Sequence, residues 1–194
     1  MAKKKGLTFY TKERKINVGI FREIAGWLFL GVLPVLVAFV FVYLFGIRTS
    51  VIGVSMEPTL HGGQEILIDR FSYLVSDPGR SDVVVFLPNG NENAHYYVKR
   101  IVGTPGDTVL IRDGLIYING EIYDDAGIFE RIADGGIAAS GVSLGEEEYF
   151  VLGDNRNDSE DSRSSNIGIV KRSFIIGRAW FHLDGGGDRA GFIK

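Results

Sequence analysis

The sequence of 194 residues contains no cysteine and only three histidines. Without cysteine the chain can form neither a disulfide framework nor a thiolate metal site, and we expect no metal and no cofactor. It also lacks an excess of positive charge, because the net charge is −3. Bulk charge therefore argues against nucleic acid as a partner. The 26 glycines, together with the lack of helical periodicity after residue 47, predict a loop-rich, mainly β protein.

One long apolar run stands out against this composition. Residues 25–46 carry no charged side chain. As a helix they would be about 33 Å long, enough to cross a hydrocarbon core of about 30 Å. A buried core helix would show a polar face, and a cleavable signal peptide would have a shorter run with a small-residue cleavage site. A retained transmembrane helix fits better than either alternative.

The charges that flank the run predict its orientation. Lysine and arginine outnumber acidic residues in residues 1–24, which we interpret as a basic cytoplasmic tail. Residues 47–194 then form a domain on the extracytoplasmic side. The expected protein is a single-pass protein of the plasma membrane, with lipid as one partner.

Short apolar runs bounded by Gly, Pro and Asp predict strands in the outer domain. These runs are residues 64–69, 81–87, 96–102, 108–112, 115–118, 148–152 and 173–181. Asp113-Gly114 is a strong signal for a two-residue hairpin, and Asn119-Gly120 is a second turn signal. Residues 124–145 are rich in Gly, Ala and acids and are expected to form a surface excursion.

Ser55 is a candidate nucleophile because of its position. It lies nine residues after Gly46, the end of the apolar run, and shortly before Pro58. Even a fully extended link of this length reaches only about 30 Å, so the serine must lie close to the membrane surface. A Ser-x-x-Pro sequence taken alone is more often a simple turn than a catalytic site.

Lys99 is the candidate base. Alternation along a strand places it on one face between Tyr97 and Ile101. Burial there would lower the lysine pKa, and a neutral amine could take the Ser55 proton and later pass it to a leaving amine. The alternative is a strand lysine whose ammonium group reaches water. His95 would share the Lys99 face, where it could tune the site.

A polar loop, residues 153–163, follows the predicted strand at 148–152. Its alternating acids, arginines and hydroxyls predict an ordered loop held by charge-assisted hydrogen bonds. A calcium loop is disfavoured, because Arg156 occupies a ligand position and Ser159 stands where glycine is required. The triplet that ends in Ser159 also matches the glycosylation sequon, which is a weak signal.

Four segments, in this order, resemble the signature boxes of the bacterial type I signal peptidases: residues 55–60, 82–86, 97–107 and 153–163. The preceding anchor is also typical of that family. The resemblance implies an antiparallel β-sheet catalytic domain, with a small inserted β subdomain at residues 108–145. It implies a membrane-bound endopeptidase that removes signal peptides from exported preproteins after small residues of the Ala-x-Ala type.

The resemblance also implies roles for individual residues. Ser55 would be the nucleophile and Lys99 the general base, with the Ser159 hydroxyl orienting the lysine amine. Asp161 and Arg163 would form a structural ion pair, and Asp154 and Arg100 would be linked to the same network. The residues expected to line the pockets for small substrate side chains are Val51, Gly53, Met56, Leu60, Tyr97 and Val98.

One position departs from some members of the family. They carry a serine two residues before the nucleophile, whose hydroxyl helps to bind the oxyanion, whereas this chain has Gly53. The oxyanion is therefore expected to rely on the Ser55 backbone N–H and on a second backbone donor or water.

Four other protein classes remain as alternatives. Self-cleaving repressor proteases carry a DNA-binding domain where this chain has an anchor, and histidine-type signal peptidases of the endoplasmic reticulum lack a lysine at the position of Lys99. Mitochondrial inner-membrane peptidases are disfavoured because a transit segment is missing. A catalytically inactive membrane-anchored binding module is disfavoured because both Ser55 and Lys99 are present.

Overall fold

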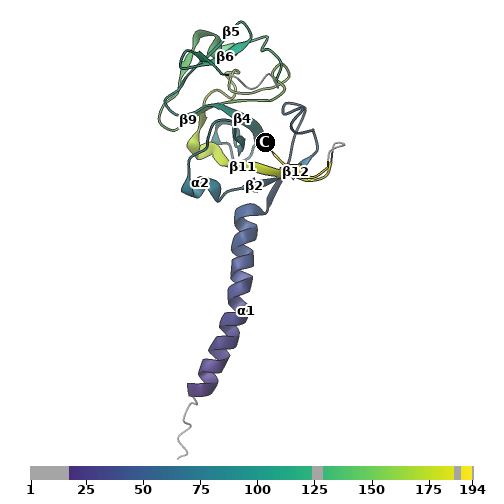
Figure 1. Ribbon diagram of the computed structural model, residues 1–194, viewed down its shortest axis with the longest axis vertical. Coiled ribbons are helices and arrows are strands. Elements are labelled where there is room, and N and C mark those ends of the chain that lie inside the picture. The colour runs from purple at the N-terminus through teal and green to yellow at the C-terminus, as the bar shows by residue number, and fades with distance from the viewer. Residues whose placement is uncertain (1–17, 124–128, 186–188, 194) are drawn as a thin grey trace, which may run out of the picture. The chain divides into compact units, whose positions relative to one another are not determined.

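The computed structural model describes residues 18–123, 129–185 and 189–193 (Figure 1). The basic residues predicted as a cytoplasmic tail lie mostly before residue 18, outside the described residues. The described chain contains one long helix, four short helical segments and two antiparallel sheets.

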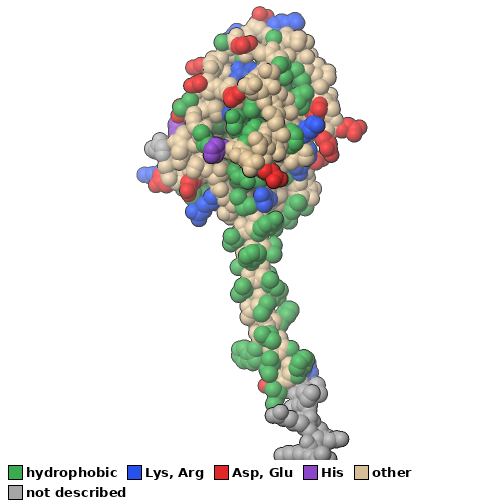
Figure 2. Space-filling model, turned by 180° about the vertical axis from the view of Figure 1, so that it is seen from behind, with side chains coloured by type: hydrophobic (Ala, Val, Ile, Leu, Met, Phe, Trp, Pro, Cys, Tyr) green, Lys and Arg blue, Asp and Glu red, His purple; other side chains and the backbone are tan. Residues whose placement is uncertain are grey.

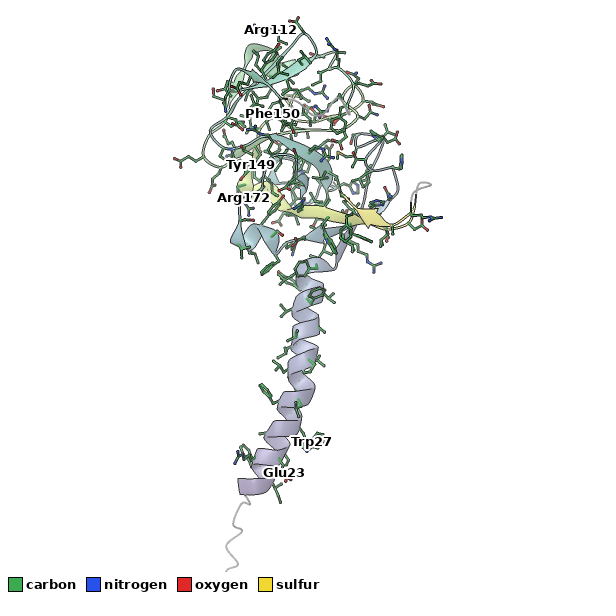
Figure 3. The ribbon with its side chains drawn as sticks, viewed as in Figure 1. Glu23, Trp27, Arg112, Tyr149, Phe150 and Arg172 are labelled. Atoms are coloured by element: carbon green, nitrogen blue, oxygen red, sulfur yellow. The ribbon has the colours of Figure 1, made fainter. Side chains whose placement is uncertain are left out.

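The long helix α1 spans Val18–Phe45 and contains Pro34. It begins earlier than the predicted start at residue 25. From Gly19 to Phe45 it is long and apolar enough to cross a membrane, and none of this span is buried by the rest of the protein. Trp27, near its start, is 76% exposed (Figure 3). Hydrophobic side chains occur along the whole length of the helix in Figure 2, which suits a lipid environment.

The larger sheet has the strand order β1-β2-β11-β3-β4-β9-β10, and β12 pairs with β11. Its strands are β1 (Ile47–Ser50), β2 (Glu65–Asp69), β3 (Val83–Phe86), β4 (Tyr97–Gly103), β9 (Glu148–Leu152), β10 (Val170–Lys171), β11 (Ile175–His182) and β12 (Gly191–Phe192). The smaller sheet is inserted between β4 and β9 in sequence. It has the order β7-β6-β5-β8, with β5 (Thr108–Arg112), β6 (Leu115–Ile118), β7 (Glu121–Ile122) and β8 (Val142–Ser143). The predicted fold class, mainly β with an N-terminal apolar helix, is confirmed.

Four short helical segments interrupt the strands after residue 47, where the sequence shows no helical periodicity. They are α2 (Ser72–Val75) and the 3-10 turns η1 (Pro88–Gly90), η2 (Gly136–Ser140) and η3 (Arg172–Phe174). Each is a single turn or little more, which is too short to produce a hydrophobic period in the sequence.

Both predicted turns of the small sheet are present. Asp113 and Gly114 have φ values of 54° and 77°, and Arg112 pairs with Leu115 across them. Positive φ at both central residues is the geometry of a type I′ hairpin, which favours Asp-Gly and Asn-Gly. The Asn119-Gly120 turn has φ values of 55° and 87° and joins β6 to β7 in the same way.

Strand β9 lies between two hydrophobic clusters, which explains its unbroken apolar sequence. Tyr149 and Val151 point into a cluster of the large sheet, whereas Phe150 and Leu152 point into a cluster shared with the small sheet (Figure 3). All four side chains are at most 1% exposed. Packing on both faces holds β9 firmly, and it therefore fixes the start of the loop that begins at Gly153.

The segment expected to form a surface excursion contributes to the core. Among its described residues, Ile132, Ala138 and Leu144 are buried in the cluster shared with the small sheet. The backbone N–H of Ile137 also donates to the carbonyl of Arg163 at 3.0 Å. The expectation of a surface excursion is therefore wrong for these residues, because packing against β5 overrides the polar, glycine-rich composition.

Candidate active site

Lys99 and Arg100 lie next to each other on strand β4, inside the large sheet. Lys99 pairs with Val84 of β3, and Arg100 pairs with Leu152 of β9. Lys99 is only 3% exposed and Arg100 only 6%. A central strand therefore carries two cationic side chains into the interior, which is unusual unless each has a specific partner.

Ser55 is held by a loop that connects β1 to β2. The loop is closed by hydrogen bonds from Val51 N to Gln64 O at 2.9 Å and from Gly63 N to Val51 O at 2.8 Å. Met56 and Leu60 anchor the loop in the hydrophobic core, since both side chains are 0% exposed. The nucleophile candidate thus sits on a turn with a firm hydrophobic base.

The structure brings the two candidate catalytic groups together. Lys99 Nζ lies 2.5 Å from Ser55 Oγ and donates to it. Burial lowers the pKa of Lys99 from 10.5 to about 8. The nearby carboxylates of Asp161, Glu160 and Asp154 oppose this effect, because they favour the charged amine. The effect of burial on the Lys99 pKa is larger than that of the carboxylates, so a useful fraction of the amine is neutral in mildly alkaline solution.

Two buried ion pairs hold the loop that follows β9. Arg100 donates from Nε to Asp154 Oδ1 at 2.8 Å and from Nη2 to Asp154 Oδ2 at 2.6 Å. Arg163 makes a matching pair of contacts with Asp161, both at 2.8 Å. Asp161 also accepts from Gly153 N at 3.1 Å. The four residues predicted as supporting are therefore found in two bidentate pairs, a geometry that adds rigidity as well as charge balance.

Ser159 lies beside this arrangement without a hydrogen bond to Lys99. Its Oγ is buried and has no hydrogen-bond partner among the residues that the structure describes. A Cβ added to Gly153 would overlap both Ser159 Oγ and the carbonyl oxygen of Ser55. Ser159 and Ser55 thus approach the same glycine, and the predicted orienting role of Ser159 stays a prediction.

A cleft of about 260 Å³ opens over the serine and the lysine. It is lined by residues of the serine loop, of strand β4 with the segment before it, and of the polar loop, namely Val51, Ile52, Ser55, His95, Tyr96, Tyr97, Val98, Lys99 and Glu160.

The six residues predicted for the substrate pockets fall into three groups. Val51, Tyr97 and Val98 line the cleft. Met56 and Leu60 lie in the hydrophobic cluster that contains Val51 and Val98. Gly53 is exposed, has a φ of +74° and has no atom within 4 Å of the position of a Cβ.

Several residues of the site were not singled out from the sequence. Asn155 clamps the serine loop, because its N–H donates to Ser55 O at 3.1 Å and its Nδ2 to Val54 O at 3.2 Å. The Arg156 guanidinium lies 4.5 Å from the centroid of the Phe129 ring, and that of Arg100 lies 5.6 Å from the same centroid. Asn155 and Arg156 belong to the dense polar loop of residues 153–163, which the sequence predicts to be ordered, whereas no local pattern marks Phe129.

Comparison with known proteins gives consistent matches. The family described as "Signal peptidase, peptidase S26" matches residues 24–183. The Synechocystis sp. protein described as "Probable signal peptidase I-2" is 39% identical over 130 residues, which is 65% of this chain but 57% of that protein. Signal peptidase I of Bacillus licheniformis is 35% identical over 136 residues, covering 66% of this chain and 72% of that protein. The crystal structure of a signal peptidase I from Enterococcus faecalis V583 is 32% identical, with a TM-score of 0.43, and the match covers 54% of this chain and 97% of that chain.

The lowered pKa of Lys99 predicts the pH dependence of any reaction in which its neutral amine acts as a base. The rate should rise with pH through about 8, because the amine loses its proton there instead of near 10.5. The measurement is kcat/KM for a peptide substrate between pH 6 and pH 10. A rate that falls as the pH rises through this window would contradict a lysine base.

The buried pair of Asp154 and Arg100 predicts a large loss of stability on its disruption. Asp154→Ala should lower the free energy of unfolding by about 3–5 kcal/mol, because it leaves a buried guanidinium without its carboxylate. Glu65→Ala is the matched control, since the pair of Arg48 and Glu65 is exposed and 3.9 Å apart, and it should change stability by less than about 1 kcal/mol. Urea unfolding in detergent compares the two, and equal losses would contradict the assignment.

Proposed function

This chain belongs to the signal peptidase family, peptidase S26, and from that premise we propose that Ser55 is its nucleophile and Lys99 its general base. At the level of the family, the chain is a serine endopeptidase that cleaves signal peptides from preproteins. The single observation that carries the proposal for the residues is the 2.5 Å contact between a buried lysine amine and a serine hydroxyl.

The proposed reaction has two halves. In the first, the neutral Lys99 amine accepts the proton of Ser55 Oγ as the oxygen attacks the scissile carbonyl. The resulting lysine ammonium gives this proton to the leaving amine, and the peptide bond breaks to leave an acyl group on Ser55. In the second half, Lys99 takes a proton from water, the hydroxide attacks the ester, and the proton returns to Ser55 as the acyl group departs.

The negative charge that develops on the substrate oxygen needs hydrogen-bond donors. Gly53 supplies no hydroxyl. The backbone N–H of Ser55 has no acceptor within the part of the chain that the structure describes, so we propose it as one donor. A backbone donor of this kind costs no reorganisation during the reaction, and loss of a comparable donor elsewhere costs about 3–4 kcal/mol.

The substrate is proposed to bind as an added strand. Strand β4 pairs with β3 along Tyr97–Arg100, but it pairs with β9 only from Arg100 onward. Within the described strands, one edge of Tyr97–Lys99 therefore has no strand partner, and an extended peptide can use its backbone groups there. Val51 and Val98 in the cleft wall favour small apolar side chains, which supports cleavage after Ala-x-Ala sequences of exported preproteins.

The chain is membrane-anchored, as its family and its exposed apolar helix indicate. We propose that the N-terminus is cytoplasmic and that the domain from residue 47 onward lies on the extracytoplasmic side of the plasma membrane. The excess of lysine and arginine before the helix supports this orientation.

We also propose that the surface around α2 touches lipid. Leu74 is 72% exposed and Val75 is 71% exposed on this short helix. The preceding Phe71 packs against Phe45, with ring centroids 5.9 Å apart. The apolar surface of α2 thus continues directly from the last turn of α1, where the lipid headgroups would lie.

The proposed catalytic dyad of Ser55 and Lys99 is tested by two substitutions. Ser55→Ala and Lys99→Ala should each lower kcat/KM for cleavage of a preprotein by at least about 10³-fold, since nucleophile and base act as one unit. The matched controls are Ser165→Ala and Lys171→Ala, because both residues are exposed and should keep full activity. Near-normal cleavage by either variant would refute the assignment. Circular dichroism checks that a loss of activity is not caused by a loss of the fold.

The orientation is tested with single cysteines, which the natural chain lacks. Ser140→Cys, at an exposed position at the end of η2, should react with a membrane-impermeant maleimide in intact cells. Lys4→Cys, in the N-terminal segment, should react only after the membrane is permeabilised. The reverse labelling pattern would show that the proposed orientation is wrong.

A further inference from the structure

Glu160 places a carboxylate at the rim of the catalytic cleft. It lines the same cleft as Ser55 and Lys99, and it is an exposed residue of the polar loop. The reaction proposed above gives it no part, because Lys99 supplies the base and Asp161 and Asp154 are bound to arginines. An acidic group at this place nevertheless lies within reach of any peptide bound beside the nucleophile.

Two neutral groups hold the Glu160 carboxylate in position. Asn166 Nδ2 donates to Glu160 Oε1 at 3.1 Å, and the Tyr97 hydroxyl lies 3.5 Å from Glu160 Oε2 as a weak donor. Asn166 is itself fixed, since its carbonyl accepts from Asn89 Nδ2 at 2.8 Å. These contacts join the polar loop to strand β4 and to the η1 turn. They fix the position of the Glu160 carboxylate at the rim of the cleft.

The charge of Glu160 is not neutralised within the described residues. No lysine, arginine or histidine there forms an ion pair with it within 4.0 Å. Asp161 and Asp154, by contrast, each share a bidentate pair with an arginine. Glu160 is therefore the carboxylate of the site that no described cationic side chain pairs with, and besides raising the Lys99 pKa its charge can act on a bound ligand.

We propose that Glu160 is a specificity-determining residue that responds to the charge of a substrate side chain close to the scissile bond, at P2 or P1′. A basic side chain at that position is attracted by the carboxylate, and an acidic one is repelled. The P1 and P3 side chains meet the apolar wall of Val51 and Val98, so alternation along a strand directs P2 away from that wall. This inference rests on the proposed function of the same cleft.

The expected size of the effect follows from the exposure of Glu160. Solvent-exposed charge pairs contribute about 0.2–1 kcal/mol, which corresponds to about 1.5- to 5-fold in kcat/KM for one favourable pair. Attraction of arginine and repulsion of glutamate act in opposite directions, so the ratio of the two substrates should be about 2- to 25-fold. Salt should reduce this ratio, because exposed charges are screened over about 3 Å at 1 M ionic strength.

The test uses the full-length protein in detergent micelles and two peptide series around one Ala-x-Ala site. One series carries Arg, Gln or Glu at P2, and the other carries the same residues at P1′. The parent should cleave the Arg peptide faster than the Glu peptide in at least one series, and Glu160→Gln should bring that ratio close to 1. A change in the Lys99 pKa cancels in the ratio, because both peptides are cleaved by the same enzyme variant.

Glu121→Gln is the matched control, since it removes the same charge from an exposed position in the small sheet and should leave the ratio unchanged. A parent without any preference for Arg over Glu, or a preference that survives in Glu160→Gln, would overturn the inference. Ser55→Ala is run in the same assay. If it is inactive while Glu160→Gln keeps the parental ratio, only the role of Glu160 fails; if it remains active, the proposed dyad itself fails.

Discussion

The removal of the Lys99 amine from water is the constraint on which the rest of the site depends. A lysine that keeps its proton at 3% exposure would be costly to bury, and a shift of its pKa from 10.5 to about 8 corresponds to about 3 kcal/mol. The protein therefore needs surroundings that are apolar enough to favour the neutral amine. It also needs a hydroxyl at hydrogen-bond distance, which Ser55 supplies at 2.5 Å.

The two buried ion pairs can be understood from the same constraint. Asp161 and Asp154 would stabilise a charged lysine if they stood alone, and they do raise the Lys99 pKa. Each is held in a bidentate pair by an arginine, and the charge of Arg163 acts on Lys99 in the opposite sense. The ion pairs thus order the polar loop, and the arginine charges balance the negative charges that the aspartates bring to the site. Strand β9, packed on both faces, and the inserted segment that contacts Arg163 hold this loop in place.

How much the sequence predicts depends on how local each signal is. The strands at residues 108–112, 115–118 and 148–152 have the predicted bounds, and Asp113-Gly114 forms the predicted hairpin, because period, length and turn chemistry are local properties. The burial of Ile132 and Ala138 was missed, since it arises from packing against a strand distant in sequence. α2 is too short to leave a period. The ring of Phe129 beside Arg156 and Arg100 follows from tertiary contacts alone.

In the candidate site, too, local features could be predicted from the sequence and tertiary contacts could not. Alternation along the strand placed Lys99 on one face with Tyr97 and Ile101, which left both a buried lysine and a lysine whose ammonium group reaches water as alternatives. The structure decides for burial, because Lys99 is 3% exposed. The short distance between Lys99 and Ser55 could not be predicted from their separation in the sequence. It depends on how the loop that carries Ser55 packs against strand β4, which is a tertiary contact. The hydrogen bond expected from Ser159 to Lys99 is not formed by the described residues, so the orientation of the amine rests on Ser55.

The central claim, that burial makes the Lys99 amine a neutral base in mildly alkaline solution, is tested most directly by titrating that amine itself. Lysine labelled with ¹³C at Cε and ¹⁵N at Nζ reports the protonation state of each amine by NMR in the full-length protein, and Lys99→Arg assigns the signal. The account predicts a midpoint at about pH 8 for Lys99. A midpoint near 10.5, the ordinary lysine value, would contradict it.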